Sequence, residues 1–212
     1  LSADTKGSTS TAVGVAALAS QNFTSATNSL NTAVGYDAGG AVTTGTANTL
    51  IGSTAGDALT EGASNAVLGR DALSADTKGS RAVAIGEAAL QAQNFTSATE
   101  NYNVAIGYAA GANVTTGTRN NLIGGQAGDA LTDADFNTAI GYSLSIDTLG
   151  SRSTAVGSHT LINQNFTSAT DTYNTVVGYA AGKEVTTGVN NTIMGGLAGD
   201  AITTGANNVC LG

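Results

Sequence analysis

The chain repeats itself on two length scales, and the shorter period excludes most folds. LSADTKGS begins at Leu1 and Leu73, and LSIDTLGS begins at Leu144, so a long repeat of 72 and then 71 residues fills the 212 residues. Within each copy, a glycine after mostly apolar residues recurs every 16, 17 or 21 residues. These anchor glycines are Gly14, Gly35, Gly52, Gly69, Gly86, Gly107, Gly124, Gly141, Gly157, Gly178, Gly195 and Gly212. This period is too short for helix pairs or propeller blades.

The repeats act as replicates of one local environment. Position −1, the residue before each anchor, is always a large aliphatic residue or Met, and we interpret this column as a core. Position −4 is Asn in nine of the twelve repeats, and the exceptions are Ser10, Ala82 and Ser153. The nine are Asn31, Asn48, Asn65, Asn103, Asn120, Asn137, Asn174, Asn191 and Asn208. Stacked Asn side chains form hydrogen bonds along the stacking axis, so these residues and the anchors, including Gly35, Gly52, Gly107, Gly124 and Gly178, are predicted to be structural.

A short β-prone segment ending at each anchor and followed by Gly-rich turns predicts an all-β parallel β-solenoid of twelve coils, each 16 to 21 residues long. In-register stacking pairs every backbone N–H and C=O with the coils on either side, which agrees with the absence of Pro. We expect three super-repeats of four coils each, residues 1–72, 73–143 and 144–212, in one continuous fibre segment. Because the chain starts at Leu1 without Met, we expect a mature or excised segment.

Positions −1 and −2 predict self-association. Side chains alternate across a strand, so the two columns face opposite ways, and position −2 is also apolar or small in every coil, from Ala12 to Cys210. A single coil covers one face only, so a second chain should cover the other. Position +3 is Ala in nine of eleven coils, which we interpret as close approach of neighbouring chains near a shared axis. A wider coil that buries both columns is the alternative.

Composition removes several classes of function. Charged residues are 10% of the chain, against about 25% in ordinary soluble domains, yet 41% hydrophobic residues and no Pro argue against disorder. The net charge of −8 comes from scattered residues, so we expect no nucleic-acid partner. No apolar run approaches the length of a membrane span, so we expect no membrane insertion.

Some stretches resemble known repeats. GSRAVAIGEAAL at residues 79–90 and NYNVAIGYAAG at residues 101–111 resemble the head repeats of YadA-like trimeric autotransporter adhesins, the haemagglutinin-like repeats. NTAVGYDAGGAVTTGTANTLIG at residues 31–52 resembles shaft repeats of phage tail fibres. The adhesin resemblance implies a left-handed β-roll and a homotrimer, and both imply an extracellular location, on a virion tail fibre or a bacterial cell surface. The present coils exceed the adhesin period of about 14 residues, so their turns should differ.

The sequence predicts no catalytic residues, metal site or cofactor. His159 is the only histidine and Cys210 the only cysteine, and we interpret them as a turn residue and a buried thiol. Asp57, Asp129 and Asp200 recur in AGDA[LI]T, but equivalent carboxylates four coils apart cannot share one calcium ion. Asp in a turn that accepts hydrogen bonds from nearby N–H groups is the better interpretation.

Two sets of aromatic residues are candidates for ligand binding. The 21-residue coils each contain NFTSAT, and its Phe either tucks over the end of the core, which we prefer, or belongs to a receptor-contacting loop. The Tyr residues that follow an anchor pack over a turn or serve as platforms for sugars. The candidates are Phe23, Phe95, Phe166, Tyr36, Tyr108 and Tyr179.

These patterns favour a non-enzymatic structural or adhesive fibre segment of a phage tail fibre or bacterial surface adhesin. Its expected partners are itself, as a homotrimer, and a host-surface glycan or protein receptor, engaged through multivalent contacts.

An ice-binding solenoid is the first alternative because Thr recurs at position −3, but residues such as Ala66 and Asn121 interrupt that column, so we expect it to line the core. A polysaccharide depolymerase spike is the second alternative, and the near-identity of the repeats argues against it.

Overall fold

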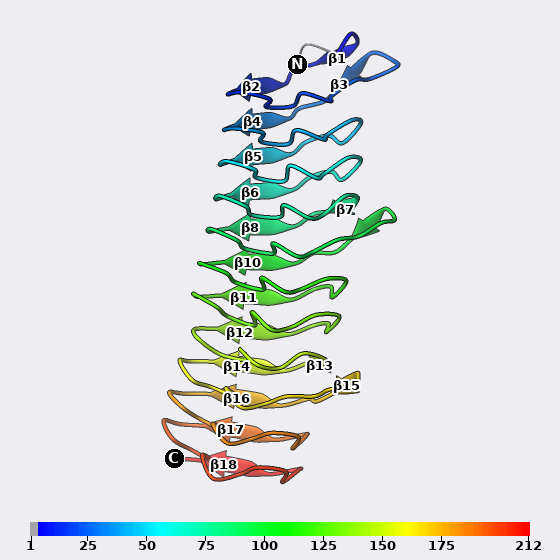
Figure 1. Cartoon of the computed structure of the whole chain (residues 1–212). Coiled ribbons are helices and arrows are strands. Elements are labelled where there is room, and N and C mark those ends of the chain that lie inside the picture. The colour runs from blue at the N-terminus through cyan, green and yellow to red at the C-terminus, as the bar shows by residue number, and fades with distance from the viewer. Residues whose placement is uncertain (1–3) are drawn as a thin grey trace. The chain divides into compact units, whose positions relative to one another are not determined.

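The computed structural model describes residues 4–212 and, within them, confirms an all-β parallel β-solenoid of about twelve coils without a helix (Figure 1). The chain divides into two compact units, Leu1–Asn103 and Val104–Gly212. In each unit, one three-residue strand per coil ends just before the anchor glycine, where the sequence pattern places it.

The first unit has five coil strands and four shorter strands. The coil strands pair in parallel in the order β2, β4, β5, β6 and β8, with residues of equal repeat position side by side, such as Val34 and Ile51. The shorter strands form two-stranded parallel sheets, β1 with β3 and β7 with β9. The strands are β1 (Gly7–Ser8), β2 (Thr11–Val13), β3 (Thr27–Asn28), β4 (Thr32–Val34), β5 (Thr49–Ile51), β6 (Ala66–Leu68), β7 (Gly79–Ser80), β8 (Val83–Ile85) and β9 (Thr99–Glu100).

The second unit repeats this plan. Its coil strands pair in parallel in the order β10, β11, β12, β14, β16, β17 and β18, and β13 pairs with β15. The strands are β10 (Val104–Ile106), β11 (Asn121–Ile123), β12 (Thr138–Ile140), β13 (Gly150–Ser151), β14 (Thr154–Val156), β15 (Thr170–Asp171), β16 (Thr175–Val177), β17 (Thr192–Met194) and β18 (Val209–Leu211).

Hydrogen bonds between coils continue around the turns. In the first unit, Thr32 N–H donates to Asn48 O at 2.8 Å beside the strand, and Thr43 N–H donates to Thr60 O at 2.9 Å on the other side of the coil. Each such bond joins equivalent or neighbouring positions of successive coils. A Pro at these positions would remove a donor from the ladder, which explains in physical terms why the chain has none.

The anchor glycines hold a conformation that no other residue adopts at low cost. Gly35 has φ +144°, and a Cβ built there would lie 2.3 Å from the carbonyl oxygen of Gly52 in the next coil. Gly178 repeats this in the second unit, with φ +137° and 2.5 Å to the oxygen of Gly195. Both conditions require glycine, so the predicted structural role of the anchors is confirmed for these residues.

The Asn residues at position −4 join successive coils as predicted. Asn48 is fully buried, its Nδ2 donates to Gly62 O at 2.8 Å, and its Oδ1 accepts from the backbone N–H of Asn65 at 3.0 Å. Asn174 and Asn191 repeat this pattern in the second unit. The ladder satisfies buried backbone groups where each coil turns into its strand.

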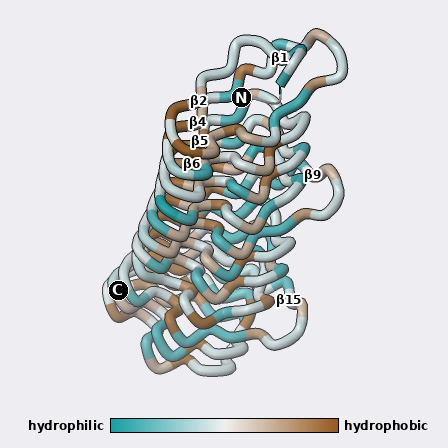
Figure 2. Tube along the Cα trace, turned by 45° about the horizontal axis from the view of Figure 1, so that its top comes forward, coloured by the Kyte–Doolittle hydropathy of each residue, from teal (hydrophilic) through white to brown (hydrophobic). Residues whose placement is uncertain are grey.

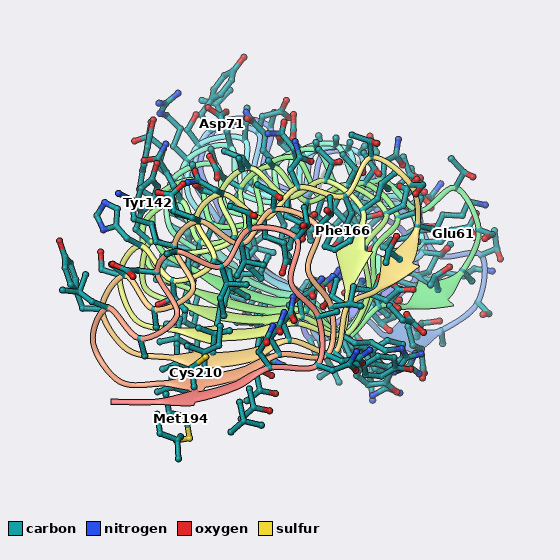
Figure 3. All side chains as sticks on the ribbon, turned by 90° about the horizontal axis from the view of Figure 1, so that it is seen from below. Glu61, Asp71, Tyr142, Phe166, Met194 and Cys210 are labelled. Atoms are coloured by element: carbon teal, nitrogen blue, oxygen red, sulfur yellow. The ribbon has the colours of Figure 1, made fainter. Side chains whose placement is uncertain are left out.

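The expectation that position −1 is the core is wrong. Position −2 faces the interior, where Ala33, Leu50 and Ile193 are fully buried, while Leu68 and Met194 at position −1 are each 48% exposed. Figure 3 shows Met194 pointing away from the strands and Cys210, at position −2 of the last coil, on their opposite side. The coil interior is narrow, so it takes the smaller side chains of position −2, and alternation places the larger ones outside.

Two related expectations are corrected by the same geometry. The Ala residues at position +3, such as Ala38 and Ala127, are fully buried inside their own coils, so they do not mark an axis shared by several chains. The Thr residues at position −3 face outward with position −1 and do not line the core, since Thr49 and Thr192 are exposed. Close packing inside each coil accounts for the small residues.

Candidate functional site

The outward side of the coil strands is the first candidate surface. We define the outer face of each unit as positions −3 and −1 of its coil strands. No residue of this face is charged in any of the twelve coils, although the chain carries 22 charged residues, 15 acidic and 7 basic. Its aliphatic column includes Val34 and Leu68 in the first unit and Ile123, Ile140 and Met194 in the second, all substantially exposed. An uncharged, regularly repeating face of this kind is typical of an interaction surface.

The 21-residue coils carry a loop that projects beside the other turns, as the segments labelled β9 and β15 show (Figure 2). The Phe of each NFTSAT sequence is buried, with exposed fractions of 5% for Phe23, 6% for Phe95 and 7% for Phe166. Figure 3 shows Phe166 among the ribbons, inside the loop. The preferred interpretation, a ring tucked over the core, is therefore confirmed, and these rings do not offer a surface to a ligand.

A buried network, which the sequence analysis missed, fixes each loop to its coil. Asp76 Oδ1 accepts from the N–H groups of Gly79 and Phe95, both at 3.0 Å, and Oδ2 accepts from Gln93 Nε2 at 2.7 Å. Gln93 Oε1 in turn accepts from Asn103 Nδ2 at 2.8 Å. Burial raises the pKa of the Asp76 carboxyl, although the hydrogen bonds from Gln93, Phe95 and Gly79 oppose this shift.

The same network recurs around the third loop. Asp147 accepts from the N–H groups of Gly150 and Phe166 and from Gln164 Nε2. Gln164 Oε1 in turn accepts from Asn174 Nδ2. Where the first coil of a copy lacks the ladder Asn, the Gln side chain thus accepts from the Nδ2 of the next ladder Asn. The signal was present in the sequence, because Gln precedes each NFTSAT, at Gln21, Gln93 and Gln164.

The tyrosines after the anchors lie on the surface, and their predicted role as platforms for sugars stays a prediction. Tyr36, Tyr108 and Tyr179 are 61%, 60% and 62% exposed. In the second unit, His159 lies between two of these rings, with centroid distances of 5.4 Å to Tyr142 and 5.9 Å to Tyr179. His159 has φ +60°, so its interpretation as a turn residue is confirmed, and the edge-to-face contacts hold the rings in place.

Position −5 carries a second row of rings, which the sequence analysis did not identify. In the second unit, the guanidinium of Arg152 lies 4.6 Å from the ring centre of Phe136 and 5.9 Å from that of Tyr173. Arg152 also pairs with Asp171 at 3.0 Å. In the first unit, Arg81 stacks on Tyr102 and pairs with Glu100. Cation–π stacking across neighbouring coils keeps these exposed rings ordered.

Two of the recurring Asp residues carry a buried oxygen without a hydrogen-bond partner, Oδ1 of Asp57 and Oδ1 of Asp129. Desolvation by burial raises the pKa of both carboxyls, and the charges of Asp37 and Asp71 add to this effect at Asp57. Among residues 4–212, no group of three or more His, Cys, Asp or Glu side chains is placed to hold a metal ion.

Replacing Asp129 by Asn is expected to stabilise the second unit at neutral pH, with a smaller gain in acid. Because the folded pKa is raised, the stability contributed by this carboxyl is present below its ordinary pKa of 3.8 and is lost as the pH rises through the folded value. We expect the thermal midpoint to rise by about 1–3 °C near pH 7. Asp200→Asn is the matched control, since Asp200 holds the same repeat position but is exposed. An equal gain for Asp129→Asn at about pH 3 and about pH 7 would contradict this linkage.

Comparison with known protein families, characterised proteins and solved structures finds no match to this chain. The part of the chain that the structure describes has no helix long and apolar enough to cross a membrane.

Proposed function

We propose that the chain is a non-catalytic segment of an extracellular fibre, of the kind found in phage tail fibres or bacterial surface adhesins. Its copies associate as a homotrimer through the outer face and present the projecting loops to a host surface. The proposal is supported by the resemblance of residues 79–90 and 101–111 to trimeric adhesin head repeats. The single observation that carries it is the uncharged outer face on both units, with its exposed aliphatic column at position −1.

A second copy of the chain is the occupant that the outer face fits best. Positions −1 and −3 repeat once per coil and in register, as Val177 beside Met194 and Thr175 beside Thr192 illustrate. A partner that matches such a face over many coils must repeat at the same spacing, and another copy does. Burying exposed aliphatic side chains stabilises the assembly by about 25 cal/mol per Å² of apolar surface.

Replacing Ile140 by Asp is expected to shift the assembly toward monomer, because it places a charge at the centre of the outer face of the second unit. Light scattering after size exclusion measures the mass. We expect the unaltered chain to give about three times 20.7 kDa and Ile140→Asp to give a mass near 20.7 kDa. Leu197→Asp is the control, since Leu197 is exposed but lies outside the outer face. A folded, unaltered chain that elutes as a monomer would overturn the homotrimer.

One observation favours ice binding as a second candidate. The Thr column faces outward, and Thr138, Thr154, Thr175 and Thr192 follow one another in four successive coils of the second unit. The first unit interrupts the column with Ala66 and Val83, so the regular Thr surface is confined to part of the chain. Thermal hysteresis from a monomeric chain, lost in Thr154→Tyr, would favour this function over the fibre.

A further inference from the structure

A cavity of about 610 Å³ lies beside the third projecting loop, entirely within the second unit. Its lining comes from the β13–β15 loop and from the turn of the preceding coil. The lining residues are Asp133, Asp135, Leu149, Ser151, Ala169, Thr170 and Asp171. None of them belongs to the outer face. The volume is that of ordinary small-molecule sites, which range from about 300 to 1,000 Å³.

The first unit contains the same backbone framework, which provides an internal comparison. Lys78 N–H donates to Phe95 O at 2.9 Å, and Leu149 N–H donates to Phe166 O at 3.1 Å. Ser80 ends the LSADTKGS segment of residues 73–80, and Ser151 ends the equivalent LSIDTLGS segment of residues 144–151. Each of these serines accepts a hydrogen bond from a backbone N–H of the preceding coil at 3.0 Å. The two places therefore share these hydrogen bonds and differ in their side chains.

In the first unit, an ion pair stands at this place. Lys78 Nζ pairs with Glu61 Oε1 at 2.9 Å, which joins the loop to the preceding turn. In the second unit, Leu149 replaces that Lys and Asp133 replaces that Glu. Leu149 cannot pair with a carboxylate, so an apolar side chain lines the cavity where the first unit has an ion pair.

The carboxylates of Asp133 and Asp135, which line the cavity with Leu149, are held in place and still have acceptor capacity. Asp133 Oδ1 accepts from the hydroxyls of Thr115 and Thr116, and Asp135 Oδ1 accepts from the N–H and hydroxyl of Thr118. The hydroxyls of Thr115 and Thr116 lower the pKa of Asp133, which keeps it ionised at neutral pH. An ionised carboxylate has about four lone-pair sites, so each can accept further hydroxyl donors.

Two exposed rings lie close in sequence to residues that line the cavity. Phe136 follows Asp135, and Tyr173 is two residues beyond Asp171. Arg152 stacks on both rings. The cavity thus combines carboxylate oxygens held by hydrogen bonds with the apolar side chain of Leu149.

We propose that this cavity binds one or two units of a neutral saccharide. The carboxylates of Asp133 and Asp135 accept sugar hydroxyls, and the C–H face of the sugar packs on Leu149. Three carboxylates against the one guanidinium of Arg152 disfavour an anionic sugar. The proposal rests on the attachment role proposed above and adds the chemistry of the attached ligand.

Saturation-transfer NMR on the whole chain tests this site. The probes are the methyl glycosides of mannose, galactose and glucose, with glucuronic acid and N-acetylneuraminic acid as anionic comparisons. Leu149→Lys restores the pairing seen in the first unit and should weaken binding of the responding neutral sugar at least about tenfold, or 1.4 kcal/mol. Asp133→Asn should weaken it as well. Ile146→Lys is the control, since Ile146 is exposed in the same segment, residues 144–151, but does not line the cavity.

The outcomes separate this proposal from the proposed fibre. Saturation of a neutral sugar that Leu149→Lys abolishes and Ile146→Lys preserves supports the site. Three results would overturn the site: no saturation-transfer signal from any of the three neutral sugars, an unchanged signal in Leu149→Lys, or signals from the anionic sugars equal to those from the neutral ones. The mass of the unaltered chain is measured independently, so a trimer that binds no sugar removes the site alone, and a monomer that binds sugar removes the trimer alone.

Discussion

Replacing Asn120 by Leu is expected to cost about 3–5 kcal/mol and to open the coils around it. The Nδ2 of Asn120 donates to Ala134 O at 2.8 Å, and its Oδ1 accepts from the N–H of Asn137 at 2.9 Å. Leu fills the same volume but leaves a buried carbonyl and a buried N–H without partners. Each unsatisfied buried group costs about 1–3 kcal/mol. Hydrogen exchange at the amide of Asn137 measures the local opening, and thermal unfolding measures the total effect.

The chain offers a control one residue away. Asn121 occupies position −3 of β11 and is exposed, so Asn121→Leu changes the same residue type without removing a ladder bond. We expect its free energy of unfolding to change by less than about 0.5 kcal/mol, as for surface positions generally. If the two variants lost similar stability, the ladder bonds of Asn120 would not be the cause.

The sequence could predict the solenoid because each coil repeats the same requirements. The spacing of the anchors located the strands, and the Asn column and the glycines identified their structural roles. The two apolar columns alone do not show which strand face is inside, because both satisfy alternation. The Asn column carries the signal that separates them. Stacked Asn side chains need burial to form a dry ladder, and position −4 shares a face with position −2, so the ladder itself indicated that Leu50 is inside and Ile51 outside.

The corners of the coils were beyond sequence reasoning. Ala47, Phe136 and Arg152 at position −5 all have φ between +58° and +63°, a conformation uncommon for residues other than Gly, Asn and Asp. Stacking fixes this geometry because each corner N–H must reach the coil before it, as Phe136 N–H reaches Thr118 O at 3.0 Å. Tertiary hydrogen bonds override the local preference there. The Arg–aromatic row at these corners was therefore visible only in the folded chain.

The candidate sites were predicted only in part for a similar reason. Alignment of the repeats located the loops and the exposed tyrosines, because both recur at fixed positions. The cavity depends instead on a difference between copies, the change from Lys78 to Leu149 opposite the change from Glu61 to Asp133. Those positions are 17 and 16 residues apart in sequence, and only stacking of the coils brings each pair together.

Replacing Gly178 by Ala is expected to destabilise the second unit by about 3 kcal/mol or more. The methyl group would lie 2.5 Å from the carbonyl oxygen of Gly195 and 2.7 Å from its carbonyl carbon, so the backbones of the two coils must separate. Ala at φ +137° adds backbone strain of about 1–3 kcal/mol, and forced overpacking adds a similar amount. Separation should weaken the bond from Gly195 N–H to Val177 O, now 2.9 Å, so exchange at the amide of Gly195 should accelerate.

Gly196→Ala distinguishes this steric cause from a general effect of losing glycine. Gly196 follows the anchor of the next coil, its φ lies outside the positive range that L side chains rarely adopt, and a Cβ there has only the oxygen of Tyr179, 4.0 Å away, as a neighbour. Ala at such a position reduces the entropy of the unfolded chain and changes stability by about 0.4–1 kcal/mol in the favourable direction. The two substitutions should thus move the thermal midpoint in opposite directions. If Gly178→Ala also raised it, the coils would have to tolerate a side chain at the anchor, and the contact between stacked anchors would no longer explain why every coil carries this glycine.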